Sequence, residues 1–131
     1  MVRPTSPTLT DAELRIMQVL WERGPSTSAE IVQAMPRKQR VADSSVRTIL
    51  RILEQKNYVR HTKEGRAFIY RAAVERADAR RNVVEYVVER FFNSSPELLV
   101  LNLLESETLD SAELERLRKL VDEQEGGSGQ A

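Results

Sequence analysis

The stretch from Asp43 to Asn57, DSSVRTILRILEQKN, sets hydroxyl, guanidinium and amide side chains along one side of a predicted helix. At about 100° per residue these groups share a face over roughly three turns; they are Ser44, Arg47, Thr48, Arg51 and Gln55. Such groups bond to phosphates and to base edges in the major groove of DNA. The spacing therefore favours a helix that reads nucleic acid, although an ordinary amphipathic helix can carry a similar solvated face.

The other side of the same helix carries a narrow apolar stripe. Its members recur at the helical period and are Val46, Ile49, Leu50 and Leu53. We expect this stripe to be buried in a core, which would turn the polar face outward. Asp43 is interpreted as the N-cap of the helix and Asn57 as a left-handed C-cap.

Composition removes several classes of function. The chain of 131 residues has no Cys and one His, so thiolate metal sites, disulfides and thiol nucleophiles are excluded. No nucleophile–base pair, carboxylate dyad or metal cluster stands out, so we expect no enzyme, cofactor or metal. No apolar run approaches the roughly 18 residues of a membrane span, and no signal peptide is evident. We therefore expect a cytoplasmic protein without membrane insertion.

Charge is segregated along the chain although the net charge is zero. Residues 37–81 hold thirteen Lys and Arg against five Asp and Glu, whereas residues 82–131 hold four against eleven. A polyanion would be attracted to the middle of such a chain and repelled by its end. Nucleic acid is the polyanion that this distribution favours.

Two Thr-x-x-Glu capping boxes predict two earlier helices, at Thr10 with Glu13 and at Thr27 with Glu30. The first helix should end near Gly24, and its expected buried residues are Leu14, Met17, Leu20 and Trp21. The second should bury Ile31, Val32 and Met35. A basic loop over 36–42 then leads to the polar-faced helix, an order typical of a loose variant of the helix-turn-helix.

The pattern then changes from helical to alternating. Residues 58–62 and 66–71 predict the two strands of a hairpin, with Gly65 supplying a positive φ in its turn. The charges at or near the tip are Arg60, Lys63, Arg66 and Arg71. His61 is interpreted as a strand-surface residue. Three helices followed by a basic hairpin predict a mainly α fold with a small β-hairpin, a winged helix-turn-helix DNA-binding domain.

The last third of the chain predicts a helical dimerisation arm. A helix over about 74–92 aligns Ala77 with four further apolar residues, Ser95-Pro96 starts another helix, and Asp110 with Glu113 caps a third. Their apolar surface needs a partner, either a second copy or other helices of a monomeric subdomain. The expected dimer contacts are Val84, Val87, Val88, Phe91, Leu98, Leu101, Leu104 and Leu117. We thus predict a DNA-binding domain (1–73), a dimerisation domain (74–124) and a disordered tail (125–131).

From about Leu9 to Val121 the chain resembles the BlaI/MecI family of bacterial repressors, the penicillinase and methicillin-resistance repressors. The resemblance is carried by LTDAELRIMQVLWERG, SSVRTILRILEQKNYV, EGRAFIY and LLVLNLLE. It implies a homodimer that binds operators of dyad symmetry, built around TACA and TGTA elements, and blocks transcription. It also implies relief by proteolysis in the arm, controlled by a membrane sensor with a zinc protease domain.

The groove-facing K-T-x-R-T segment of that family corresponds in this sequence to Ser44, Ser45, Arg47 and Thr48. Two positions differ, since Ser44 stands in place of Lys and Ser45 in place of Thr. The predicted DNA-binding set is Ser44, Ser45, Arg47, Thr48, Arg51, Arg60, Lys63 and Arg66. The family's V-L-N-F cleavage segment reads V-L-N-L here, so Asn102 and Leu103 flank the candidate bond. Asn102 could instead fix the register of a dimer core.

Two function classes compete with a dimeric repressor. A winged helix can serve as a protein-interaction module, but such a surface should expose an apolar patch. The predicted face is instead hydroxyl and guanidinium beside a basic hairpin, which favours DNA. An enzyme is the weakest interpretation, because the abundant Asp and Glu stand at capping and solvent positions.

Overall fold

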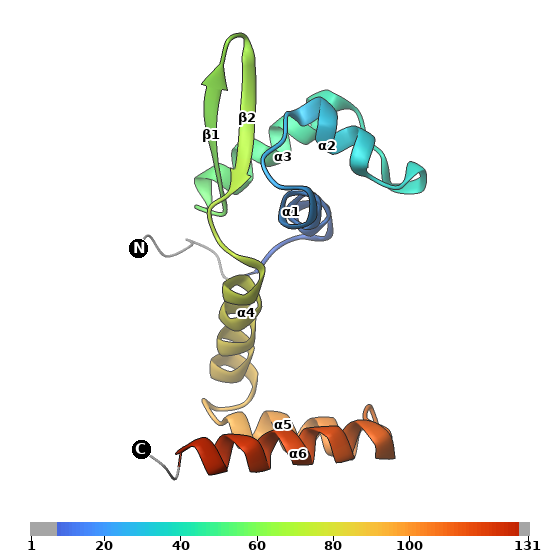
Figure 1. Ribbon diagram of the computed structural model, residues 1–131, viewed down its shortest axis with the longest axis vertical. Coiled ribbons are helices and arrows are strands. Elements are labelled where there is room, and N and C mark those ends of the chain that lie inside the picture. The colour runs from blue at the N-terminus through green and yellow to red at the C-terminus, as the bar shows by residue number, and fades with distance from the viewer. Residues whose placement is uncertain (1–7, 129–131) are drawn as a thin grey trace. The chain divides into compact units, whose positions relative to one another are not determined.

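A computed structural model describes residues 8–128 (Figure 1). The helices are α1 (Asp11–Arg23), α2 (Ser28–Ala34), α3 (Asp43–Gln55), α4 (Arg76–Phe91), α5 (Pro96–Glu105) and α6 (Ser111–Ser128), with a short 3-10 turn, η1 (Arg37–Gln39), before α3. Strands β1 (Val59–Glu64) and β2 (Ala67–Ala72) pair antiparallel. Three helices followed by a hairpin confirm the predicted winged helix.

The chain divides into two compact units between Tyr86 and Val87, inside α4. The sequence predicts this boundary earlier, between residues 73 and 74. The difference has a packing cause, because Val74 and Ala79 are buried in the core of the first unit and bind the beginning of α4 to it. The buried alanine of α4 is thus Ala79, whereas Ala77 is exposed.

The core of the first unit gathers side chains from α1, α2, α3 and the hairpin. From α3 it takes Val46, Leu50 and Leu53, each fully buried, with Ile49 packed against them. This confirms the apolar stripe of that helix. In α1 the burial differs in part from the prediction, because Ile16 is fully buried while Leu14 is exposed. The spacing of apolar residues predicted which side of α1 is buried, but not which residues lie in the middle of that side.

The indole of Trp21 joins α1 to the segment before α4. It is only partly buried, and its Nε1 donates a hydrogen bond of 2.9 Å to the carbonyl oxygen of Val74. The guanidinium of Arg76 lies 5.5 Å from the centre of the ring. Trp21 therefore packs at the edge of the core, as a partly apolar and partly polar side chain can.

The capping boxes form as predicted. In the first, the amide of Glu13 lies 3.2 Å from Thr10 Oγ1, and the amide of Thr10 lies 2.7 Å from Glu13 Oε1. Thr27 and Glu30 repeat this arrangement in α2. For α3 the prediction was wrong, since Ala42 is the N-cap and Asp43 is the first helical residue. A side chain in that first turn can bond within the helix, and Asp43 pairs with Arg47 instead of capping.

Glu13 also receives a second partner from the end of α3. It is buried, and its Oε1 lies 2.8 Å from the ammonium nitrogen of Lys56. Burial by itself would raise the pKa of Glu13, but the hydrogen bonds from Lys56 and from the Thr10 backbone outweigh it and hold the pKa below its ordinary value. The pair therefore joins the start of α1 to the end of α3, so the core fixes how the polar face of α3 is presented.

We expect Glu13→Gln to destabilise the chain by about 1–3 kcal/mol at neutral pH, because it leaves the half-buried Lys56 ammonium unpaired. The lowered pKa of Glu13 means that its contribution is present above its unfolded value near 4.5 and is lost as pH falls through the folded value. Urea unfolding across this range should show a shallower acid loss in the variant. An equal acid loss in both proteins would contradict the proposed linkage.

The second unit exposes most of its apolar side chains. In α5 no residue is buried, and its exposed apolar residues are Leu98, Val100, Leu101, Leu103 and Leu104. On α6 the exposed apolar residues are Leu114, Leu117, Leu120 and Val121. Caps form as predicted, because Ser95 Oγ accepts from the amide of Leu98 and Asp110 Oδ1 accepts from that of Glu113. This unit has apolar surface that a single chain leaves uncovered.

The end of the chain differs from the prediction. The helix α6 runs to Ser128, so residues 125–128 are helical rather than disordered. The remaining residues of the expected tail, 129–131, lie outside the described part of the chain. Among the described residues, none of the helices combines the length and apolar content needed to cross a bilayer.

Candidate nucleic-acid interface

The outward face of α3 carries every residue predicted for it. The side chains of Ser44, Ser45, Arg47, Thr48, Arg51 and Gln55 are all exposed, opposite the buried Val46, Leu50 and Leu53. Thr48 Oγ1 donates to the carbonyl oxygen of Ser44 at 3.0 Å, so its hydroxyl proton is already engaged and its lone pairs remain as acceptors. The helix thus presents donors and acceptors together on one rigid surface.

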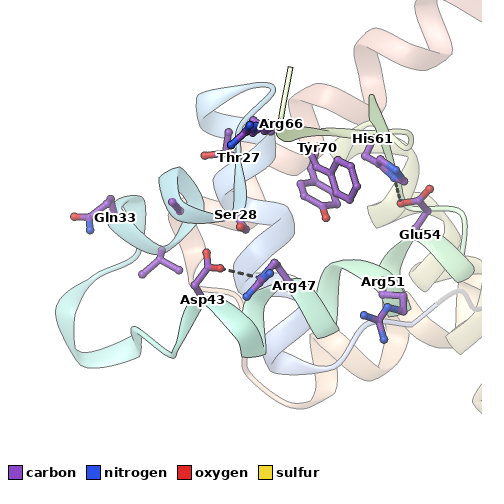
Figure 2. Close-up of a pocket in the computed structure, with 14 residues that line it drawn as sticks. Thr27, Ser28, Gln33, Asp43, Arg47, Arg51, Glu54, His61, Arg66 and Tyr70 are labelled. Carbon is purple, nitrogen blue, oxygen red and sulfur yellow. Dashed lines mark hydrogen bonds and ion pairs between the residues drawn. The ribbon is translucent and has the colours of Figure 1, made fainter. Parts of the chain in front are cut away.

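A groove of about 700 Å³ lies between α2, α3 and the hairpin (Figure 2). Its cationic lining residues are Arg47 and Arg51 from α3 and Arg66 from the hairpin turn, and its anionic ones are Asp43 and Glu54. Tyr70 is buried in the wall of the groove. Burial raises the pKa of Tyr70, and the Glu54 carboxylate raises it further against the opposing effect of Arg47 and Arg51. The phenol is therefore neutral at physiological pH.

The hairpin is joined to α3 through His61. Its Nδ1 lies 2.6 Å from Glu54 Oε1, and its ring lies 4.8 Å from Phe68 and 5.7 Å from Tyr70, centre to centre. Directly opposed residues of an antiparallel pair share a face, so the pairs His61–Tyr70 and Lys63–Phe68 place these four side chains together. This inner face contacts α3 through the hydrogen bond between His61 and Glu54, which fixes the hairpin beside that helix.

The predicted basic residues of the wing divide between its faces. Lys63 is on the inner face, whereas Arg60 pairs with Arg71 on the outer face, where Arg71 Nη2 donates to Thr62 Oγ1 at 3.2 Å. Arg66 lies in the turn beside Gly65, which has the expected positive φ of 63°. The side chains of Arg60, Lys63 and Arg66 are all exposed. Their contact with DNA stays a prediction.

Sequence reasoning missed two polar side-chain contacts of this surface. Arg47 Nε lies 2.9 Å from Asp43 Oδ2, and His61 pairs with Glu54. The first could have been found, because Asp and Arg four residues apart face each other on a helix. The second depends on where the strand passes the helix, which no local spacing encodes.

The residues predicted for dimerisation differ in exposure. Most are exposed in the single chain, namely Val84, Phe91, Leu98, Leu101, Leu104 and Leu117. Val87 is half-buried, and Val88 is buried within the chain itself. Asn102 and Leu103 are exposed on α5, where the carbonyl oxygen of Asn102 accepts from the amide of Ser106 at 3.0 Å. Over residues 8–128, no cluster of three or more His, Asp and Glu side chains could hold a metal.

The comparison with protein families decides the classification. Residues 9–123 match the family described as Penicillinase repressor. The chain belongs to the penicillinase repressor family. This repressor is 28% identical over 117 residues to the Penicillinase repressor of Bacillus licheniformis, covering 89% of this chain and 91% of that one. It is 23% identical over 113 residues to the Methicillin resistance regulatory protein MecI of Staphylococcus aureus, covering 86% and 92%.

Among solved structures, the solution structure of the DNA binding domain of the repressor BlaI is 29% identical, covers 55% of this repressor and 88% of that chain, and has a TM-score of 0.48. The family match confirms the resemblance noted in the sequence. It also confirms the class of function, a DNA-binding transcriptional repressor rather than an enzyme.

Proposed function

We propose that this chain represses transcription as a homodimer on operator DNA of dyad symmetry, with α3 of each copy in the major groove of one half-site and the β1–β2 wing on the adjacent backbone. The observation that carries the proposal is the exposed face of α3, where Arg47 and Arg51 stand among hydroxyls over a fully buried stripe. Arginine and hydroxyl side chains on a rigid helix are the groups that read base edges and bond phosphates.

The exposed face of α3 supports DNA over a protein partner. A protein-binding module would expose an apolar surface there. That face instead carries hydroxyl, amide and guanidinium groups, from Ser44, Arg47, Thr48, Arg51 and Gln55. The excess of Lys and Arg in residues 37–81 adds a long-range attraction for a polyanion.

Dimer formation is supported by the second unit. Helices α5 and α6 expose a series of leucines, and residues 82–131 hold eleven Asp and Glu against four Lys and Arg. An acidic surface is repelled by DNA, while an apolar one gains from burial against a second copy. A two-fold assembly would place two reading helices on one face of the duplex, spaced by whole turns of about 34 Å.

Relief of repression by cleavage between Asn102 and Leu103, under a membrane sensor protease pathway, is the regulatory part of the proposal. Both residues are exposed, but the bond lies inside α5. A protease needs extended substrate, so local unfolding of α5 must precede cleavage. Mass spectrometry of the chain from cells with an active sensor should detect a fragment ending at Asn102, and intact chain alone would exclude this route.

Gel-shift titration of the full-length chain on the promoter of its own operon tests the central proposal. We expect a discrete complex that survives excess unrelated duplex, since specific affinities exceed non-specific ones by about 10³-fold or more at physiological salt. Equal competition by both DNAs would exclude specific operator binding at that promoter.

The wing should act through charge rather than sequence. Replacing Lys63 or Arg66 with Ala should weaken binding to operator and unrelated DNA about equally, and should flatten the salt dependence by about one unit for each phosphate that the variant no longer neutralises. Lys119→Ala, on the exposed surface of the acidic unit, is the matched control and should leave the slope unchanged. A wild-type slope in both wing variants would place the wing away from the backbone.

A further inference from the structure

The guanidinium of Arg47 is held in place before any DNA binds. Its Nε lies 2.9 Å from Oδ2 of Asp43, one helical turn earlier, as the dashed line in Figure 2 shows. The two side chains are 59% and 43% exposed, so water screens the pair and it adds little to folding stability. The contact biases the orientation of Arg47 toward Asp43 while it adds little to the stability of α3.

Asp43 is itself anchored by its place in the chain. It is the first residue of α3, where unpaired backbone N–H groups and the helix dipole favour a negative charge. Its second oxygen, Oδ1, is buried and has no hydrogen-bond partner among the described residues. A buried oxygen without a partner costs stability, so this carboxylate is poorly explained as a stabilising group.

The pairing leaves one edge of the arginine available. With Nε engaged by Asp43, the two terminal nitrogens, Nη1 and Nη2, remain to donate in parallel. Two parallel N–H donors match O6 and N7 of guanine, the commonest specific contact in the major groove. A side chain fixed in that geometry loses less rotamer freedom on binding.

The carboxylate also opposes unspecific contact. Asp43 lies in the same groove as Arg47, Arg51 and Arg66, where it reduces the attraction that these cations exert on any phosphate backbone. A group that restrains Arg47 and repels phosphates should raise affinity for the correct bases while lowering it for others. Specificity is this difference of affinities.

We propose that Asp43 is a specificity-determining positioning residue, which acts by orienting Arg47 toward a guanine and by weakening non-specific binding. The inference rests on the proposed function, because it assumes that α3 reads bases. It assigns to Asp43 a role in DNA selection in place of the capping role expected from the sequence.

The test uses the full-length chain, a duplex selected by the wild type from a random pool, and a scrambled duplex of the same composition. We expect Asp43→Asn to weaken binding to the selected duplex by about tenfold while leaving the scrambled duplex bound equally or more tightly. Asp43→Glu keeps the charge within reach of Arg47 and should retain most of the selectivity. Asp78→Asn removes a solvent-accessible carboxylate paired with Arg81 on α4, and it should change nothing.

A double-mutant cycle then decides whether Asp43 acts through Arg47. In an Arg47→Ala background, Asp43→Asn should cause no further loss of selectivity. Wild-type selectivity in Asp43→Asn, or an undiminished effect of that change without Arg47, would overturn the inference. So would an equal weakening on both DNAs together with a lowered melting temperature. A wild-type chain that enriches no sequence from the pool would instead refute the proposed function itself.

Discussion

Removal of residues 93–131 is expected to leave a folded monomer that binds its operator at least about 100-fold more weakly than the full chain. The first unit keeps its core, because all the residues of the core cluster lie between Ile16 and Ala79. What the truncation removes is α5 and α6, most of whose leucines are exposed in the single chain. Two linked reading heads bind the second half-site as an intramolecular event, and a monomer loses that gain.

Sedimentation of both proteins at micromolar concentration, with binding titrations on one and two half-sites, measures this effect. The truncated chain should bind a duplex with two half-sites only about twofold more tightly than a duplex with one, because two independent sites merely double the chance of binding. Its binding to a single half-site serves as the control for folding, and it should match that of one head of the full chain. A full-length chain that sediments as a monomer, or a truncation with undiminished operator affinity, would contradict the dimer.

The local parts of the fold could be predicted from the sequence. Each capping box is a contact between residues three apart, so Thr10 with Glu13 and Thr27 with Glu30 specify helix starts with little help from the rest of the chain. Gly65 similarly marks its turn by the positive φ that it adopts. The helical repeat of apolar and polar residues predicted both faces of α3.

The parts that the sequence did not reveal depend on contacts between residues of different elements. The unit boundary lies within α4 because Ala79 packs into a core made of α1, α3 and the hairpin. The burial of Glu13 follows from Lys56, which is 43 positions away. Likewise, the wing is fixed by the contact of His61 with Glu54, seven positions apart but in different elements. No periodicity in one segment can reveal such partners.

Asp43 shows how a local rule can select the wrong role. An acidic residue before an apolar period is a good N-cap, and the sequence alone favoured that assignment. The cap instead falls one residue earlier, at Ala42, which turns Asp43 into a first-turn residue within reach of Arg47. A shift of one position thus places the carboxylate beside Arg47 instead of at the N-cap.

Arg47→Ala is expected to weaken operator binding by about 1–3 kcal/mol, roughly 5- to 150-fold, while leaving folding unchanged. The side chain is exposed and opposite the stripe of Val46, Leu50 and Leu53, so its removal opens no cavity. Binding to unrelated DNA should fall much less, because only one of several cations is removed. Arg81→Ala is the matched control, since Arg81 is an exposed arginine paired with an aspartate on α4. Fluorescence anisotropy on operator and scrambled duplexes, with thermal melts of each protein, separates the outcomes. Operator binding equal to wild type would show that another face of the molecule reads the bases.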